Sequence, residues 1–365
     1  MISTNLTYIK LLFGLIIVWL LASCNNEVTN KLEAKGTALG TMNEIVVIAD
    51  DALWESAVGD TFRYYFESAY PILPQPEPLF DLRHFSPQDL QGQPLRKELR
   101  TYTILADLSD ADSETTKMVK KDLGSEKFDY ATKPGATTSS VGRDKWARGQ
   151  LLVYLYAPDR TALSAAIKKS FPAITKKVHE HDKKQLRSTI YVDRANLGLS
   201  EKVRERFHID FQVPGDFVVA TDDIENNVLW MRKVGEKADQ NIVLQRFSYD
   251  DEAQLSKQGI INMRDKFGRT YVTSDEEDDF MVVDEDVLPV YEYSFTLDNH
   301  YGKELRGIWE MTNAFSGGPF NTYVILNEAK RELIYVDVFV LAPGTTKRDH
   351  MMQLDHIVKT ARIVS

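Results

Sequence analysis

The sequence predicts an α+β protein of two domains, and three observations point to this fold class. The chain of 365 residues is long for one domain and comfortable for two. Its composition, 43% hydrophobic and 27% charged, is that of an ordinary globular protein. Strand-length and helix-length segments alternate in the first half of the chain, whereas the second half is a series of strands with two helices.

The predicted divisions follow changes in composition and in hydrophobic rhythm. Residues 1–23 are expected to be a leader, and the polar stretch 24–38 a flexible tether. An N-terminal α+β domain is expected over 39–206. A C-terminal α+β domain is expected over 207–365, because strict alternation of apolar and polar residues begins at residue 207.

The elements of the first domain follow from hydrophobic spacing and from turn residues. The apolar run 44–49 has strand length, and Asp50 and Asp51 stand where a helix N-cap belongs. Four prolines within 71–78 impose an extended connection. The next expected elements are a strand over 100–108, a polar insertion around one short helix over 109–145, a strand over 150–156, a helix over 160–181 with a kink at Pro172, and a helix over 199–206.

The second domain is expected to be a largely antiparallel sheet with covering helices, because short strands follow one another through turns and hairpins. Its predicted strands are 207–213, 217–221, 228–234, 242–247, 290–295, 304–311, 321–326 and 333–340, with helices over 252–267 and 346–360.

A leader is indicated by the uncharged run from Leu11 to Ala22, which follows Lys10. The run is too short to span a bilayer, which takes about 20 apolar residues, and it has the form of a secretory signal. Leu21, Ala22 and Ser23 precede Cys24 and resemble the lipobox of bacterial lipoproteins. This resemblance implies that Cys24 is modified with lipid, since a thiolate is a strong nucleophile and several acyl chains hold a protein at a membrane.

Cys24 is the only cysteine of the chain, so its lipidation leaves no thiol for a disulfide. The alternative is a buried core cysteine that happens to follow an apolar stretch. Asn25 follows the cysteine in place of the aspartate that retains some lipoproteins at the inner membrane. The protein is therefore expected in the cell envelope, anchored by lipid. The favoured location is the outer membrane, with the folded part facing the periplasm.

The formal net charge is −10, which argues against a nucleic-acid partner because such a partner needs a basic face. It argues equally against attraction to anionic lipid. The remaining expected partners are the membrane, through the lipid, and an envelope protein or glycan.

Three segments carry a resemblance to a known family. Val213–Phe217, Gly317–Phe320 and Ala342–Arg348, together with the lipobox, resemble the bacterial lipoprotein family named domain of unknown function 4837, over most of residues 38–365. The resemblance implies a lipid-anchored envelope protein without an assigned reaction. The order of strands and helices in the second domain also resembles the α/β/α sandwich of PsbP and the Mog-one proteins.

Two loops are candidate binding sites. The acidic stretch 275–286 offers carboxylates to a hard cation, but it lacks the order of an EF-hand, and a solvated loop is the favoured interpretation. Ser316–Phe320 holds two glycines that could bind an anion through their amides. A turn or bulge where two backbones pass closely is favoured there, because Pro319 has no amide to donate.

The histidines do not form a metal-site pattern. His179 and His181 are two apart, and His350 and His356 are six apart, so neither pair shares a helix face. Neither a metal nor a cofactor is predicted, and the catalytic residues are unknown. Lys347 and Arg348, at the start of the last predicted helix, oppose the helix dipole; a solvated pair is favoured over an anion or partner contact.

The sequence supports two functions. The favoured one is a non-enzymatic binding or accessory module, because the chain carries no motif of a nucleophilic or metal-dependent enzyme. The alternative is a hydrolase acting on an envelope polymer, with its site between the two domains.

Overall fold

A computed structural model describes residues 35–133, 136 and 138–364, and the lipobox with Cys24 lies outside this range. Its contacts divide the chain into two compact units. The described residues up to Asp60 form the first unit together with Arg83–Ser170. Thr61–Leu82 and the residues from Phe171 onward form the second. The predicted boundary between residues 206 and 207 stays a prediction.

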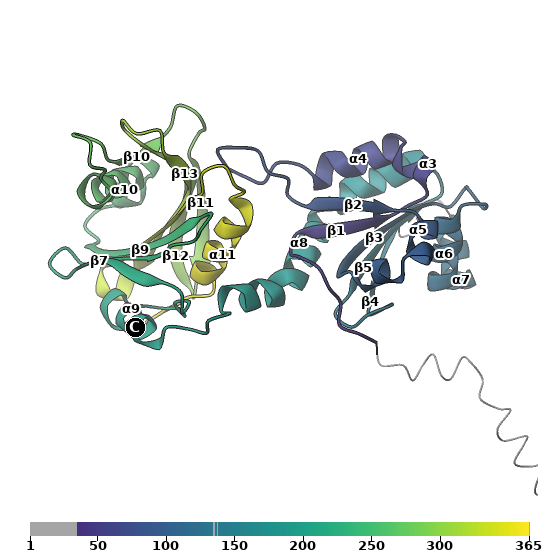
Figure 1. Cartoon of the computed structure of the whole chain (residues 1–365), viewed down its shortest axis with the longest axis horizontal. Coiled ribbons are helices and arrows are strands. Elements are labelled where there is room, and N and C mark those ends of the chain that lie inside the picture. Colours follow the sequence, from purple (N-terminus) through teal and green to yellow (C-terminus); the bar gives the residue numbers. More distant parts are fainter. Residues whose placement is uncertain (1–34, 134–135, 137, 365) are drawn as a thin grey trace, which may run out of the picture. The chain divides into compact units, whose positions relative to one another are not determined.

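A sheet with the strand order β2-β1-β3-β5-β4 carries the first unit (Figure 1). β1 (Glu44–Ile48), β3 (Thr101–Asp107) and β5 (Leu151–Ala157) run parallel, and β4 (Ser139–Arg143) runs antiparallel to β5. The central strands β3 and β5 are buried along their whole length, as strands of a covered parallel sheet are. The other elements that begin before residue 171 are α3 (Asp51–Trp54), α4 (Ala57–Phe66), β2 (Asp81–Phe85), α5 (Pro87–Gly92), η1 (Pro94–Glu98), α6 (Glu114–Leu123), α7 (Ser125–Ala131) and α8 (Arg160–Ile190).

The polar insertion predicted over 109–145 has more structure than expected. It forms two helices, α6 and α7, and the edge strand β4. Val119, Phe128 and Ala131 pack into the core with the sheet, and the partly buried Met118 and Leu123 pack against it, so a short apolar face holds these helices in place. The helix predicted over 160–181 continues to Ile190, with Pro172 inside it, because Leu186 and Ile190 extend its buried face.

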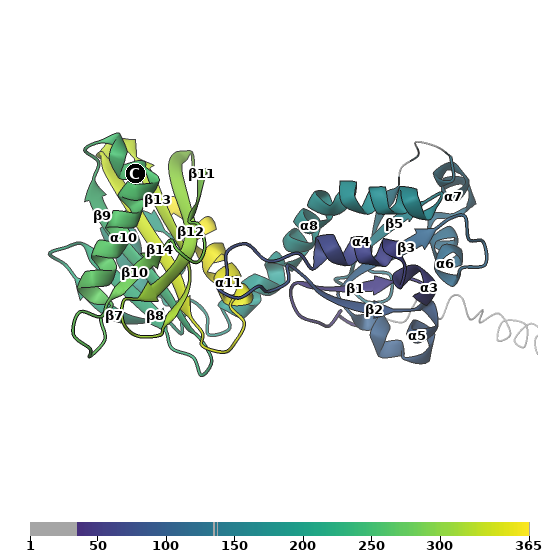
Figure 2. The same cartoon turned by 90° about the horizontal axis from the view of Figure 1, so that it is seen from above.

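The second unit is built on an antiparallel sheet with the strand order β10-β12-β13-β14-β9-β8-β7, and β11 pairs with β12. Two helices cover it on opposite faces, α10 (Lys257–Tyr271) on one and α11 (Arg348–Lys359) on the other (Figure 2). The α+β fold class and the antiparallel C-terminal sheet are thereby confirmed. The strands are β7 (Val218–Asp223), β8 (Val228–Lys233), β9 (Asp239–Ser248), β10 (Met281–Asp284), β11 (Tyr291–Leu297), β12 (His300–Met311), β13 (Gly317–Asn327) and β14 (Glu332–Leu341).

Each covering helix is tied to the sheet by buried charges. On the α10 face, Arg264 pairs with Asp337 at 3.2 Å, and both side chains are fully buried. On the α11 face, Arg306 joins Glu304 to Asp355, a helix residue that also accepts hydrogen bonds from sheet side chains. Burial opposes ionisation of Asp355, but the positive charges of Arg306 and Lys359 and the hydrogen bonds from Tyr323 and Asn321 together outweigh it and lower the pKa of this carboxyl group. This network fixes α11 and therefore the turn that precedes it.

Three predictions in the second unit are wrong in detail. The strand predicted over 207–213 is reduced to the two-residue β6 (Ile209–Asp210), which pairs with β15 (Arg362–Ile363), because α9 (Leu197–Phe207) extends through Phe207. The acidic stretch 275–286 is not only a loop: it contains β10, whose Met281 is fully buried. The helix predicted over 252–267 divides into η2 (Glu252–Leu255) and α10.

Within the described part of the chain, none of the helices combines the length and the apolarity needed to cross a bilayer.

Candidate functional site

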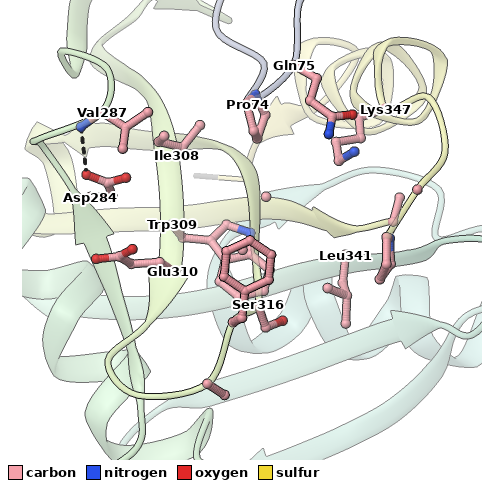
Figure 3. A pocket seen from close by; sticks show the side chains of 17 residues that line it. Pro74, Gln75, Asp284, Val287, Ile308, Trp309, Glu310, Ser316, Leu341 and Lys347 are labelled. Carbon is pink, nitrogen blue, oxygen red and sulfur yellow. Dashed lines mark hydrogen bonds between the residues drawn. The ribbon is translucent and has the colours of Figure 1, made fainter.

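Two of the glycine- and proline-containing segments singled out in the sequence meet at one pocket of the second unit. One is the turn between β12 and β13, and the other is Ala342–Gly344, between β14 and α11. The pocket, named the turn pocket below, has a volume of about 450 Å³ (Figure 3). It is lined by Pro74, Gln75, Asp284, Val287, Ile308, Trp309, Glu310, Ala314, Phe315, Ser316, Gly317, Gly318, Leu341, Ala342, Pro343, Gly344 and Lys347.

The glycines of the first turn are required by close approach of backbone. Gly318 lies opposite Trp309 in the β12–β13 ladder, and a Cβ atom on it would stand 2.0 Å from the carbonyl oxygen of Val340. A Cβ on Gly317 would stand 2.6 Å from the carbonyl oxygen of Trp309. Both distances are far below van der Waals contact. The predicted close passage of two backbones at Ser316–Phe320 is confirmed.

One wall of the turn pocket comes from the proline-rich segment 71–78. Pro74 and Gln75 line the pocket, and Glu77 binds the start of α11. The carboxylate of Glu77 accepts hydrogen bonds from the backbone amides of Lys347, at 2.6 Å, and Arg348, at 2.9 Å. Free amides at a helix N-terminus are a natural site for a negative charge, and here a residue of the same chain occupies it.

Lys347 and Arg348 are buried, so the favoured prediction of a solvated pair is wrong. The guanidinium of Arg348 donates to the carbonyl oxygen of Pro78 at 2.6 Å and pairs with Asp81 at 2.8 Å. The charge of Arg348 is therefore balanced by Asp81, which, like Pro78, lies about 270 residues away in the sequence. These contacts hold Pro74 and Gln75 beside the pocket.

The polar groups of the turn pocket differ along its length. Lys347 lies near Gln75, whereas Asp284 and Glu310 lie together, and Figure 3 draws Trp309 between the lysine and the glutamate. Burial raises the pKa of Glu310, and the charges of Asp284 and the nearby Asp286 raise it further. The pocket thus combines a cationic end, an aromatic middle and an acidic end.

The acidic stretch 275–286 supports the loop that forms one pocket wall. Asp279 is buried and accepts hydrogen bonds from the backbone amides of Asn313, at 2.8 Å, and Ala314, at 3.2 Å. Asp284 accepts from the amide of Val287 at 3.0 Å. Among the described residues, no three His, Cys, Asp or Glu side chains converge on a position that could hold a metal ion.

Three of the four candidate histidines, His179, His350 and His356, lie in different surroundings. His179 packs on the ring of Phe80, with 5.3 Å between ring centroids. His350 lies 2.7 Å from the side-chain nitrogen of Gln240, and His356 lines a different pocket together with Arg187 and Tyr191. Neither sequence pair is brought together on a common ligand position.

Sequence reasoning named the two turns but not the site they form. The missed residues are Trp309 and Glu310, whose patterns are those of ordinary strand ends, and Pro74 and Gln75, which come from a distant segment. The lipobox residues Leu21, Ala22 and Ser23, and Cys24 itself, lie outside the described residues, and their modification stays a prediction.

Solved structures are similar to a part of the chain at low sequence identity. Solved structures of similar fold include LpqN of Mycobacterium tuberculosis, described as involved in cell envelope biogenesis, at 12% identity over 43% of this chain and 83% of LpqN, with a TM-score of 0.28. The Ran-binding protein Mog1p of Saccharomyces cerevisiae is similar at 9% identity over 43% of this chain and 91% of Mog1p, with a TM-score of 0.29. No curated protein sequence matches the chain.

Two family models match the sequence, and each is a domain of unknown function. Residues 196–360 match DUF4837, and residues 38–191 match DUF8532. The predicted resemblance to the first family is confirmed for the C-terminal part. Its expected extent over most of 38–365 is wrong, because a different model matches the N-terminal part. Residues 38–191 are therefore similar to the DUF8532 family, and residues 196–360 are similar to the DUF4837 family.

Proposed function

We propose that the chain is a lipid-anchored protein of the cell envelope whose second unit binds a ligand in the turn pocket without transforming it. The observation that carries the binding function is the pocket itself, in which buried hydrogen-bond donors of Lys347 and Trp309 face a cavity of about 450 Å³. Cavities of this size lined by apolar side chains and a few polar groups are typical of small-ligand sites.

The anchor part of the proposal rests on the sequence. Leu21, Ala22 and Ser23 before Cys24 have the residue types and the order that a lipidation signal requires, behind an apolar run of suitable length. Asn25 favours the outer membrane, with the folded units in the periplasm.

The anchor is tested by growing cells with radiolabelled palmitate and separating membranes from soluble protein. The wild-type chain is expected in the membrane fraction with the label. A Cys24→Ser variant is expected to lose the label, and a Ser23→Ala variant is expected to keep it, because alanine is also small. A soluble, unlabelled wild-type protein would contradict the anchor.

The second candidate is a hydrolase of an envelope polymer, favoured by one observation in the turn pocket. Glu310, whose pKa is raised by burial and by Asp284, has the character of a general acid beside a second carboxylate. Incubation of the protein with peptidoglycan fragments separates the two candidates. Product formation that Glu310→Gln abolishes would favour the hydrolase, and intact fragments with both proteins would favour binding.

A further inference from the structure

We infer that the turn pocket takes a ligand in which a carboxylate is joined to an apolar body, with the carboxylate at Lys347 and Trp309. The inference rests on the proposed binding function, because it names the ligand class for the same site. Three properties of the pocket carry it: an underpaired buried ammonium group, a buried indole N–H without a partner, and an apolar wall that leads toward an acidic end.

The ammonium group of Lys347 is short of acceptors. The residue is only 5% exposed. Its Nζ atom has one hydrogen-bond partner among the described residues, the carbonyl oxygen of Thr345 at 2.9 Å, although an ammonium group carries three donors. No carboxylate of the described chain lies within salt-bridge distance of Nζ. A buried cation is costly unless a negative charge pairs with it, so this end of the pocket favours an anion.

The indole of Trp309 supplies a second donor. The residue is 4% exposed, and its Nε1 atom is buried without a hydrogen-bond partner in the described structure. The indole N–H of the other tryptophan in this unit, Trp230, is paired with the side-chain oxygen of Asn241 at 3.0 Å. Since buried N–H groups are nearly always paired, an acceptor from a ligand is the natural partner for Trp309.

The rest of the pocket defines the body of the ligand. Ile308, Leu341, Pro343 and Pro74 offer apolar surface. Asp284 and Glu310 place negative charge away from Lys347, which disfavours a second anionic group on the ligand and sets its direction in the pocket. A monoanionic carboxylate with an apolar body fits both ends. Two sources carry this chemistry, a fatty acid and the free C-terminus of an apolar peptide.

The test is calorimetric titration of the full mature chain, kept in the detergent that its lipid anchor requires, with three probes. Octanoate represents the fatty acid, N-acetyl-leucyl-leucine represents the peptide C-terminus, and octanamide is the neutral counterpart of octanoate. We expect at least one of the two acids to bind. If octanoate binds, octanamide should bind at least about tenfold more weakly, because its neutral amide cannot make the charge-assisted hydrogen bonds of the carboxylate. The acid that binds more tightly identifies the source.

Variants then assign the carboxylate to its partner. Lys347→Met keeps the apolar stem of the side chain and the backbone contact with Glu77, and it should weaken acid binding about tenfold or more while leaving octanamide unaffected. The matched control is Lys266→Met, an exposed lysine on α10, which should change nothing. Lys347→Arg should restore much of the acid affinity, since it restores the charge.

Three outcomes would overturn the inference. The first is that neither acid binds, and the second is that octanamide binds as tightly as octanoate. The third is that Lys347→Met and Lys266→Met have the same affinity for the acid. Binding of octanamide alone would overturn the ligand class while leaving the turn pocket as a binding site. If Lys347→Met fails to fold, the comparison of the acids with octanamide on the wild-type chain still decides.

Discussion

Replacing Glu77 with alanine removes the carboxylate that binds the first amides of α11. Two hydrogen bonds are lost, from the amides of Lys347 at 2.6 Å and Arg348 at 2.9 Å. A hydrogen bond to a charged group contributes about 1.5–3 kcal/mol, which gives an upper bound of about 3–6 kcal/mol for the pair. Water can reach part of the freed helix end, so we expect a net loss of about 2–3 kcal/mol in the local stability of α11.

Hydrogen exchange measured by mass spectrometry reports this loss directly. In Glu77→Ala, the amides of Arg348–Lys359 should exchange about 30–150-fold faster, since about 1.4 kcal/mol corresponds to a factor of ten. Peptides from α10 should be unchanged, and Glu67→Ala, at an exposed position near the same segment, serves as the control. If α11 exchanges at the wild-type rate in a folded Glu77→Ala protein, the carboxylate does not hold the helix start and the wall of the turn pocket has another support.

Two further outcomes follow from the same unit. Gly318→Ala should lower the unfolding free energy of this unit by about 1–3 kcal/mol, because the new Cβ would stand 2.0 Å from a carbonyl oxygen. The control is Gly198→Ala in the same unit, where the nearest atom to the new Cβ would stand at 3.8 Å. Equal urea midpoints of the two variants would contradict the close approach. Burial lowers the pKa of His350 below the ordinary 6.5, so the unfolded chain takes up a proton first and stability is lost as the pH falls below about 6.5. His350→Gln should show a smaller drop in urea midpoint between pH 7.5 and 5, and an undiminished drop would show that other groups cause it.

Much of the second unit could be predicted because most of its strands are apolar runs of strand length. Leu333–Val340 is a nearly continuous apolar run rich in β-branched residues, and it is observed as part of the fully covered strand β14. β10 could not be predicted, because its four residues stand between runs of carboxylates and its burial comes from pairing with β12 and from packing against α10. β4 could not be predicted for a similar reason, because it is a short polar edge strand that is held by its pairing with β5.

The turn pocket shows a sharper limit of sequence reasoning. The glycine–proline turns were visible, but their meeting depends on the ladder that sets Gly318 opposite Trp309. The role of Lys347 depends on Glu77, which occupies the helix start in place of a solvent anion. Charge pairs across about 270 residues leave no local pattern, so a lysine expected in solvent is found buried beside a cavity.

The central claim, that the turn pocket is a binding site for an apolar carboxylate, is tested most directly by the indole N–H resonance of Trp309. This signal is assigned by its loss in Trp309→Phe. On titration with octanoate and with N-acetyl-leucyl-leucine, we expect a downfield shift of the Trp309 indole proton with at least one acid, because the free N–H gains an acceptor. The Trp230 signal, whose N–H is already paired with Asn241, should stay in place. A Trp309 signal that does not move at concentrations far above those used in calorimetry would contradict the claim.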